Sequence, residues 1–185
     1  MAKINHGARF QEDIQNSANK QDVWFMRIKD VHIPFKLRGQ IKVSRNEYDN
    51  LMFYDGVLFP MELKSTQSKS VSFDEAIIKQ HQIENLQKAH TYKGVIAGFL
   101  MNFRTYDNAT FFIPVDRFVE YMLVAQNGLE HNYTAKVNKS SIPLDICKEI
   151  GYELFGIKKR TRYQYYIKDL LSTLSSTYNI NKTPL

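Results

Sequence analysis

The most constraining feature of this sequence is a tight turn at Asp55-Gly56, which has apolar residues on both sides. A two-residue type I′ turn needs positive φ at both central positions, and Asp-Gly is a favoured pair there. Two strands should therefore pair antiparallel, with Tyr54 opposite Val57 and, further along, Asp49 opposite Glu62. We predict a β-hairpin in which two carboxylates meet across the strands.

Two carboxylates directly opposite each other destabilise a strand pair unless something positive lies between them. Mg²⁺ is commonly bound by one or two carboxylates, with waters or phosphate oxygens completing its shell. Side chains alternate along a strand, so Lys64 shares a face with Glu62 and can reach the same ligand. We interpret Asp49, Glu62 and Lys64 as a metal-dependent phosphodiesterase site.

Two structural interpretations of the same stretch stay open. The register also places Glu47 opposite Lys64, so an ordinary cross-strand ion pair would account for the lysine. Pro60 cannot donate a hydrogen bond to a neighbouring strand, and prolines in sheets often mark edges or bulges. A bulge there would turn Asp49 to the other face.

Size and charge narrow the class of protein. With 185 residues we expect one domain, 1–185, and the net charge of +6 suits a polyanionic partner. Cys147 is the only cysteine, so no disulfide can form within the chain, as is typical of a reducing, cytoplasmic setting. The first residues have no apolar h-region and no apolar run could span a bilayer, so we expect neither a secretory signal nor a membrane partner.

The order of predicted elements indicates a mixed central sheet flanked by helices, an α/β (α+β) fold. Beside the hairpin we predict strands over 23–28, 93–103 and 110–115. We predict helices over 7–20, 73–89, 117–126, 143–154 and 163–178. Ser72 and Glu75 resemble a capping box, which would start the second helix there.

Basic residues gather in three segments. The polar stretch 29–47 is either a plain solvated loop or an exposed phosphate-binding arm. A second group lies near Lys139, and the run 158–162 is the third. The residues that we expect to bind nucleic acid are Lys36, Arg38, Lys42, Arg45, Lys139, Ser140, Lys158, Lys159, Arg160 and Arg162.

Other catalytic chemistry finds no support in the sequence. The five histidines form no zinc-type pair, and there is no nucleophile elbow, P-loop or dinucleotide fingerprint. Cys147 is most simply a small buried residue.

Four separated motifs resemble the RecU-type Holliday junction resolvases, including their phage-encoded relatives. The motifs are Gly7-Ala8-Arg9-Phe10-Gln11-Glu12-Asp13-Ile14, Asp49 with Glu62-Leu63-Lys64, Ser72-Phe73 with His81-Gln82-Ile83-Glu84, and Lys139-Ser140-Ser141-Ile142. Together they cover most of the chain and place it near the wider nuclease class with an Asp…(Asp/Glu)-x-Lys motif.

The resemblance implies roles for the matching residues. Asp49 and Glu62 would bind Mg²⁺, helped by the backbone carbonyl of Leu63, with Mn²⁺ able to substitute. Lys64 would orient the attacking water or stabilise charge that develops on the phosphate. Gln82 would lie beside this site.

The resemblance also implies a restriction-endonuclease-like core, a homodimer, and a protruding stalk, here a short one over about 32–46. The tail, 179–185, is expected to fray. The family usually has a glutamate where this chain has Gln11, and Glu12 comes next. Because helical direction changes by about 100° per residue, either could face the metal. Glu12 is our third acidic candidate.

The leading hypothesis is a Mg²⁺-dependent, structure-selective DNA endonuclease that resolves four-way junctions in recombination and repair. A nuclease of the same class acting on duplex, flap or specific-sequence DNA is the first alternative. A DNA-binding recombination accessory protein that has lost activity is the second, and a basic scaffold domain is the third.

Overall fold

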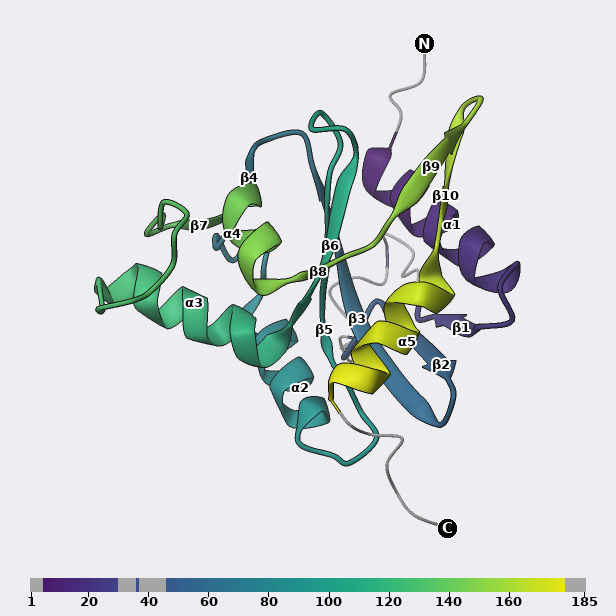
Figure 1. The fold of residues 1–185 in the computed structure, drawn as a ribbon, viewed down its shortest axis with the longest axis horizontal. Coiled ribbons are helices and arrows are strands. Elements are labelled where there is room, and N and C mark those ends of the chain that lie inside the picture. The colour runs from purple at the N-terminus through teal and green to yellow at the C-terminus, as the bar shows by residue number, and fades with distance from the viewer. Residues whose placement is uncertain (1–4, 30–35, 37–45, 179–185) are drawn as a thin grey trace.

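The computed structural model describes residues 5–29, 36 and 46–178, and within them the chain forms a mixed central sheet (Figure 1). The sheet has six strands in the order β1-β2-β3-β5-β6-β8. Their bounds are β1 Trp24–Arg27, β2 Asn50–Tyr54, β3 Val57–Thr66, β5 Gly98–Phe103, β6 Ala109–Pro114 and β8 Tyr152–Glu153. Only the β3–β5 pair is parallel among these strands. The predicted mixed sheet with flanking helices is confirmed.

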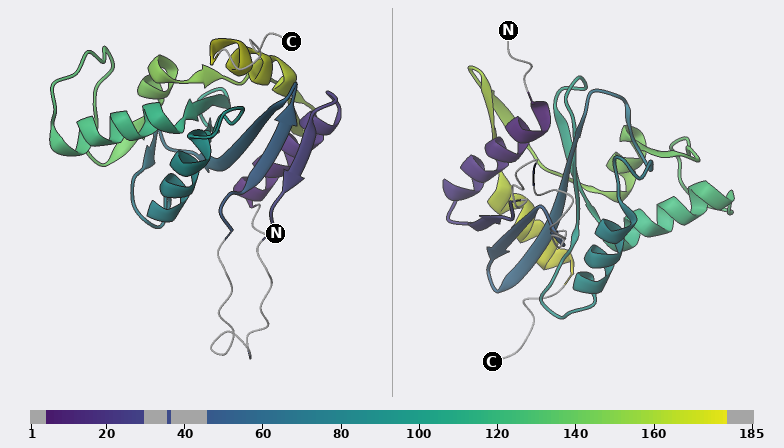
Figure 2. Two further views of the ribbon diagram at one scale, coloured as in Figure 1. Left: turned by 90° about the horizontal axis from the view of Figure 1, so that it is seen from below. Right: turned by 180° about the vertical axis from the view of Figure 1, so that it is seen from behind.

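Helices cover both faces of this sheet (Figure 2). One face carries α1 (His6–Asn19) and α5 (Ile167–Thr177), and the other carries α2 (Gln80–His90), α3 (Val115–Asn127) and α4 (Leu144–Ile150). Side chains alternate along β5, so Phe99 and Met101 join the core under α2 and α3, while Leu100 joins the core under α1 and α5. The sheet thus separates two hydrophobic cores.

Two short antiparallel pairs complete the described fold. β4 (Ser70–Ser72) pairs with β7 (Ser141–Pro143) beside α4. β9 (Gly156–Lys159) and β10 (Arg162–Tyr165) form a hairpin that lies along α1. None of the described helices is long and apolar enough to cross a bilayer.

The hairpin at Asp55-Gly56 has the predicted register. Both turn residues have positive φ, 49° at Asp55 and 76° at Gly56, as a type I′ turn requires. Tyr54 pairs with Val57, and the ladder continues through Leu51 opposite Pro60 without a shift. The alternative of a bulge at Pro60 is therefore wrong.

The second helix begins later than predicted. Ser72 ends β4, and its hydroxyl accepts a hydrogen bond from the Asp74 N–H at 3.0 Å. The Asp74 carboxylate in turn accepts from the Ala76 N–H at 2.7 Å, which makes a turn instead of a helix. The predicted capping box is thus wrong, and α2 starts at Gln80.

Two helices near the C-terminal end are shorter than predicted. α4 ends at Ile150 because Gly151 is extended and leads into β8. The predicted helix 163–178 begins only at Ile167, since the preceding basic run turns back on itself at Arg160, where φ is 36°. The tyrosines there are strand formers and belong to β10.

The predicted stalk, about 32–46, lies outside the described residues except for Lys36 and Asn46, and the tail 179–185 also lies outside them.

Gly98 provides a test of how tightly the sheet is packed. A methyl group at Gly98 would collide with the Ile113 carbonyl oxygen and lie 2.7 Å from the Phe112 ring. Because Gly98 pairs on both sides, with Met61 and Pro114, neither neighbour can move away freely. We expect Gly98→Ala to lower the free energy of unfolding by roughly 1–3 kcal/mol in urea denaturation.

Gly7→Ala is the matched control for Gly98→Ala. Gly7 is exposed on α1, and a methyl group there would meet only the Asn5 side chain, at 3.6 Å. Alanine favours helix over glycine by about 1 kcal/mol, so this variant should be at least as stable as the native protein. Equal losses in the two variants would contradict the packing argument.

Candidate functional site

Glu62 and Lys64 lie side by side on β3 and face α2. They pair with Phe99 and Met101 of β5, whose side chains belong to the core beneath α2 and α3. The Glu62 residue is only 1% exposed, and the Lys64 side chain is 14% exposed. The predicted shared face of these two side chains is therefore observed, in a largely buried setting.

Asp49 joins this pair from the position just before β2. The β2–β3 ladder ends at Asn50 opposite Met61, and beyond it the Asp49 Oδ2 atom accepts a hydrogen bond from the Leu63 N–H at 3.1 Å. The Asp49 side chain thus binds β3 just beyond the point where backbone pairing between β2 and β3 ends. Its carboxylate lies close enough to Glu62 to raise the pKa of the Glu62 carboxyl group.

Gln82, in the first turn of α2, connects the acid and the amine. Its Nε2 atom donates to Glu62 Oε2 at 2.5 Å, and its Oε1 atom accepts from Lys64 Nζ at 2.9 Å. The same Oε1 atom accepts from the Lys79 N–H at 3.2 Å, which ties the start of α2 to the site. Lys64 Nζ lies 3.4 Å from Glu62 Oε2, so Lys64 pairs here and not with Glu47.

The Glu62 carboxyl group is strongly perturbed. Burial and, to a smaller extent, the nearby Asp49 charge raise its pKa to about 8, although Lys64 opposes the shift. One proton is therefore retained on this pair of carboxyl groups near neutral pH when nothing positive bridges them. Bringing a divalent cation between them would release that proton, since metal ligands must be deprotonated.

The donor set fits a hard divalent cation with an incomplete protein shell. Asp49 and Glu62 offer carboxylate oxygens, which suit Mg²⁺ or Mn²⁺ and leave room for waters or phosphate oxygens. Within the described residues no group of three or more His, Cys, Asp or Glu side chains gathers around one point. The Leu63 carbonyl remains a predicted ligand.

Glu12 does not join the described site, which corrects the prediction of a third acidic residue. Helix α1 packs on the opposite face of the sheet, burying Phe10 and Ile14 there. Glu12 is exposed on α1, and its Oε2 atom pairs with Arg162 Nη2 at 2.7 Å. Glu12 therefore pairs with Arg162 of the β9–β10 hairpin, and we no longer assign it to the metal site.

The predicted nucleic-acid contacts divide into three groups. Lys36, Lys139, Ser140 and the hairpin residues Lys158, Lys159 and Arg160 are exposed. Arg162 pairs with both Glu12 and Asp13, and its contact with nucleic acid stays a prediction. Three further predicted contacts lie outside the described residues: Arg38, Lys42 and Arg45.

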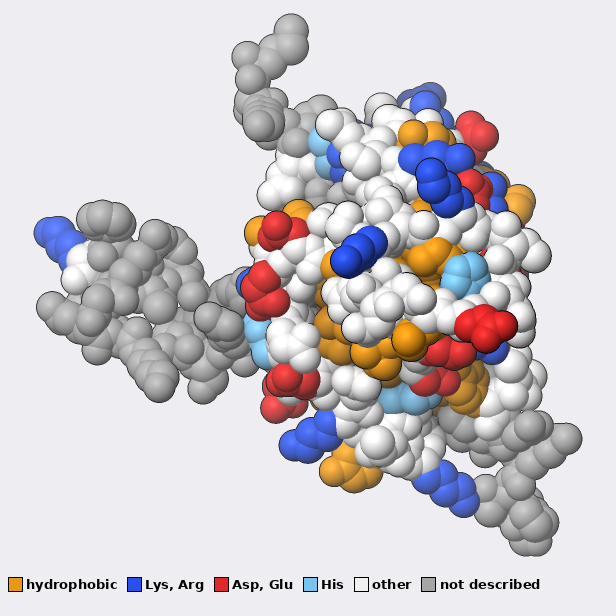
Figure 3. All heavy atoms as spheres, turned by 90° about the vertical axis from the view of Figure 1, so that its left-hand side faces the viewer, with side chains coloured by type: hydrophobic (Ala, Val, Ile, Leu, Met, Phe, Trp, Pro, Cys, Tyr) orange, Lys and Arg blue, Asp and Glu red, His pale blue; other side chains and the backbone are white. Residues whose placement is uncertain are grey.

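The charged side chains on one face of the molecule do not form a basic patch. On the face seen in Figure 3, basic and acidic side chains are interspersed, so that face has no continuous basic area. A polar cavity on the α1 side has a lining that includes Arg9, Asn102 and Arg104, and it was not predicted from the sequence. These residues are isolated in the sequence, which offers no pattern that would group them.

A family model and a relative with a similar sequence both match most of this chain. The family model "RecU: Recombination protein U" matches residues 36–167. The SPbeta prophage-derived uncharacterized protein YotM of Bacillus subtilis (strain 168) is 44% identical over 185 residues, covering 100% of this chain and 94% of that protein.

A solved structure supports the fold class. Hjc, a Holliday junction resolvase from Archaeoglobus fulgidus, is similar with a TM-score of 0.50 and 15% sequence identity. The similarity covers 80% of this chain and 95% of Hjc. At this identity the likeness concerns the fold alone, and it confirms the expected restriction-endonuclease-like arrangement.

The raised pKa of Glu62 predicts an unusual dependence of stability on pH. In the unfolded chain the pKa returns to about 4.5, so the folded state holds the proton more tightly. The resulting stabilisation is complete below about pH 4.5 and is lost as pH rises through 8. In EDTA, urea denaturation should show a loss of roughly 3–5 kcal/mol from this group across that range.

Glu62→Gln isolates this contribution. Glutamine stays neutral at every pH and has nearly the same shape, so the variant should lack the fall between pH 5 and pH 9. At pH 9 it should be more stable than the native protein. Identical pH profiles for the two proteins would show that Glu62 titrates normally.

Proposed function

The chain belongs to the RecU family, and from that premise we propose that it is a divalent-metal-dependent DNA endonuclease that acts on four-way junctions. The observation that carries the proposal is the meeting of Asp49 and Glu62, with Lys64 and Gln82 beside them. Two carboxyl groups that meet in a largely buried setting are costly to ionise together, and such pairs concentrate at functional sites. We assign the nuclease domain to the whole chain, 1–185, working in the cytoplasm.

The proposed chemistry assigns each side chain a separate task. A bound Mg²⁺, or Mn²⁺ in its place, supplies Lewis acidity and an activated water. Asp49 and Glu62 hold the ion, and the Leu63 N–H holds the Asp49 carboxylate in place at 3.1 Å. Lys64, positioned by Gln82 at 2.9 Å, offers positive charge where negative charge develops on the phosphate.

The RecU family and the symmetry of junction cutting support the proposed substrate, a four-way junction, and the proposed homodimer. Two copies in a homodimer would present two such sites, which is what cutting two strands of a junction requires. Exposed lysines and arginines would contribute phosphate contacts that carry no sequence information and weaken with salt. Junction shape, and not base sequence, would then select the substrate.

One observation favours a second candidate, a DNA-binding accessory protein with impaired catalysis. Glu12 pairs with Arg162, and the described residues bring only two carboxylates to the site. A third acid would strengthen ion binding, so the two-acid site could be weak. The two candidates differ in whether purified protein cuts DNA when Mg²⁺ or Mn²⁺ is added.

Asp49→Asn is the sharpest test of catalysis. The asparagine oxygen can still accept the Leu63 N–H bond, so the fold should survive while the ligand charge is lost. We expect cleavage of a labelled four-way junction in Mg²⁺ to fall by roughly 10³-fold or more, with junction binding in Ca²⁺ retained. Forked and linear duplex DNA of the same sequence, cut more slowly by the native protein, would establish selectivity.

Glu84→Gln is the matched control for Asp49→Asn. Glu84 is an exposed carboxylate on α2 whose hydrogen-bond partner within the described part of the chain is Gln80, at 3.1 Å. Its cleavage rate should equal that of the native protein. A native protein that binds junctions but leaves them uncut in both metals would instead favour the accessory role.

Gln82 is predicted to position Lys64 and Glu62. Gln82→Met keeps the volume but removes both polar contacts, so cleavage should fall by roughly 10–100-fold with little change in junction affinity. Gln82→Glu would add a third carboxylate beside Glu62 and should shift the pH profile of cleavage upward. A change in affinity without a change in rate would argue against the positioning role.

A further inference from the structure

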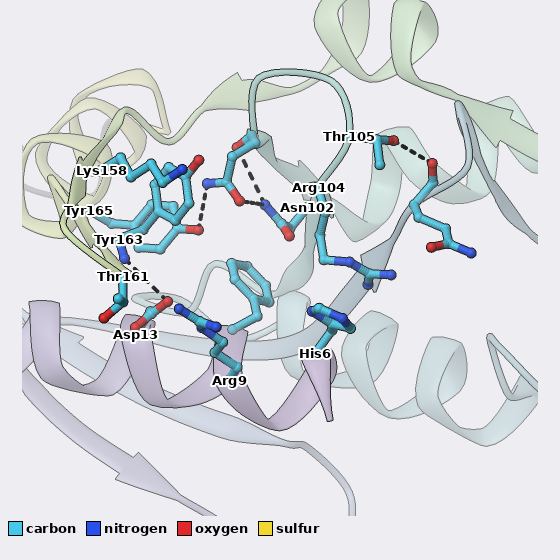
Figure 4. A pocket seen from close by; sticks show the side chains of 13 residues that line it. His6, Arg9, Asp13, Asn102, Arg104, Thr105, Lys158, Thr161, Tyr163 and Tyr165 are labelled. Carbon is cyan, nitrogen blue, oxygen red and sulfur yellow. Dashed lines mark hydrogen bonds between the residues drawn. The ribbon is translucent and has the colours of Figure 1, made fainter. Parts of the chain in front are cut away.

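A polar cavity opens on the face of the sheet opposite Glu62 (Figure 4). It measures about 340 Å³ and lies between α1, the β5–β6 turn and the β9–β10 hairpin. Each of these elements contributes a basic side chain, namely Arg9, Arg104 and Lys158, and His6 lies at the start of α1. Three separate segments therefore converge on one hollow.

The charge balance of the cavity favours an anion. Asp13 is the only acidic residue among the described residues of its lining, and Arg162 already pairs with it. Among the described residues, neither the Arg9 guanidinium group nor the Lys158 ammonium group has a hydrogen-bond or ion-pair partner. Two unpaired cations across a hollow attract a phosphate group more strongly than any neutral ligand.

The wall formed by β5 is rigid before any ligand arrives. Arg104 Nη1 donates to the Ser65 carbonyl oxygen at 3.1 Å and to its hydroxyl at 3.2 Å. Asn102 is 1% exposed, accepts from the Ser65 hydroxyl at 2.9 Å and donates to the Asn108 side chain at 3.0 Å. Asn108 Nδ2 then donates to the Tyr165 hydroxyl at 2.8 Å. This network links two sides of the cavity.

Aromatic rings line the third side. Tyr163 and Tyr165 are stacked, with ring centroids 6.1 Å apart and an angle of 26° between planes. Tyr165 is buried, whereas Tyr163 is partly exposed and offers its ring to the cavity. Cationic groups beside an available aromatic ring are typical of sites for unpaired nucleic-acid strands, because each base can stack on the ring.

The cavity adjoins the proposed catalytic strand. Ser65 follows Lys64 on β3, so their side chains point to opposite faces of the sheet. The Ser65 hydroxyl contacts Asn102 and Arg104 of the cavity wall, one residue beyond the lysine of the site. A strand that bends around this end of the sheet can touch both faces.

We propose that this cavity is a second DNA site, which takes one nucleotide of an unpaired strand, with its phosphate between Arg9 and Lys158 and its base on Tyr163. The assignment to DNA rests on the proposed function. A duplex keeps its bases stacked inside the helix and cannot insert one without unpairing it. The cavity therefore selects strands that are already open, as at a branch point.

The test measures binding of fluorescent oligothymidylate by anisotropy, in EDTA so that no cleavage occurs. The Arg9→Gln/Lys158→Gln variant should bind about tenfold more weakly than the native protein. The slope of log affinity against log salt should also fall by about 0.7, since the two cations share one phosphate and each single-strand phosphate contact contributes about 0.7. Affinity for linear duplex should change much less.

The matched control is Lys20→Gln/Lys93→Gln, which removes the same charge from two exposed lysines outside the cavity lining. Lys20 lies just beyond the end of α1, and Lys93 follows α2, which covers the other face of the sheet. Its affinity for oligothymidylate should stay within about twofold of the native value. Equal losses in both variants would overturn the proposal, because only net charge would then matter.

Two further measurements separate the base contact and the ligand source. An oligonucleotide carrying 5-iodouracil should photocrosslink to Tyr163, and crosslinking elsewhere only would overturn the proposed base contact. Thymidine monophosphate should compete far less well than the oligonucleotide, and equal competition would indicate a mononucleotide site instead. A protein that binds as expected but never cuts DNA would refute the proposed nuclease function and leave this site standing.

Discussion

The site depends on one hydrogen bond, from the Leu63 N–H to the Asp49 carboxylate. Two acids repel each other, and Asp49 lies before the first paired residue of β2, where backbone pairing no longer holds it. The amide of β3 supplies the restraint, and it does so from the residue between Glu62 and Lys64. β3 therefore supplies the Glu62 carboxyl group, the Lys64 ammonium group and the Leu63 N–H that binds Asp49.

The parts of this arrangement that follow from local rules could be predicted from the sequence. The Asp55-Gly56 turn determines the register, and a period of two then places Lys64 beside Glu62. Gln82 could be located only through resemblance, because its contact with Glu62 spans twenty residues and depends on where α2 begins. α2 begins only after a turn in which the Asp74 carboxylate accepts a hydrogen bond from the Ala76 N–H. In the sequence, the residues of this turn resemble the start of a helix.

Two of the errors share a physical cause, which is competition from partners distant in the chain. The family resemblance suggests Glu12 as a metal ligand, yet Arg162, 150 residues away, binds it. The predicted helix 163–178 includes Tyr163 and Tyr165, but pairing with β9 makes them part of a strand. Tertiary contacts outweigh local preference in both cases, and no spacing rule within one segment could have shown them.

The amide of Gln82 has a consequence for how the site tolerates change. Lys64 Nζ and the Lys79 N–H can only donate, so the Gln82 amide oxygen must face both of them, and its Nε2 atom is left to donate to Glu62. The Gln82 amide therefore has a donor end and an acceptor end, and the two cannot be exchanged. Neither a symmetric carboxylate nor a hydrocarbon can mimic it, which makes this position far less forgiving than its modest size suggests.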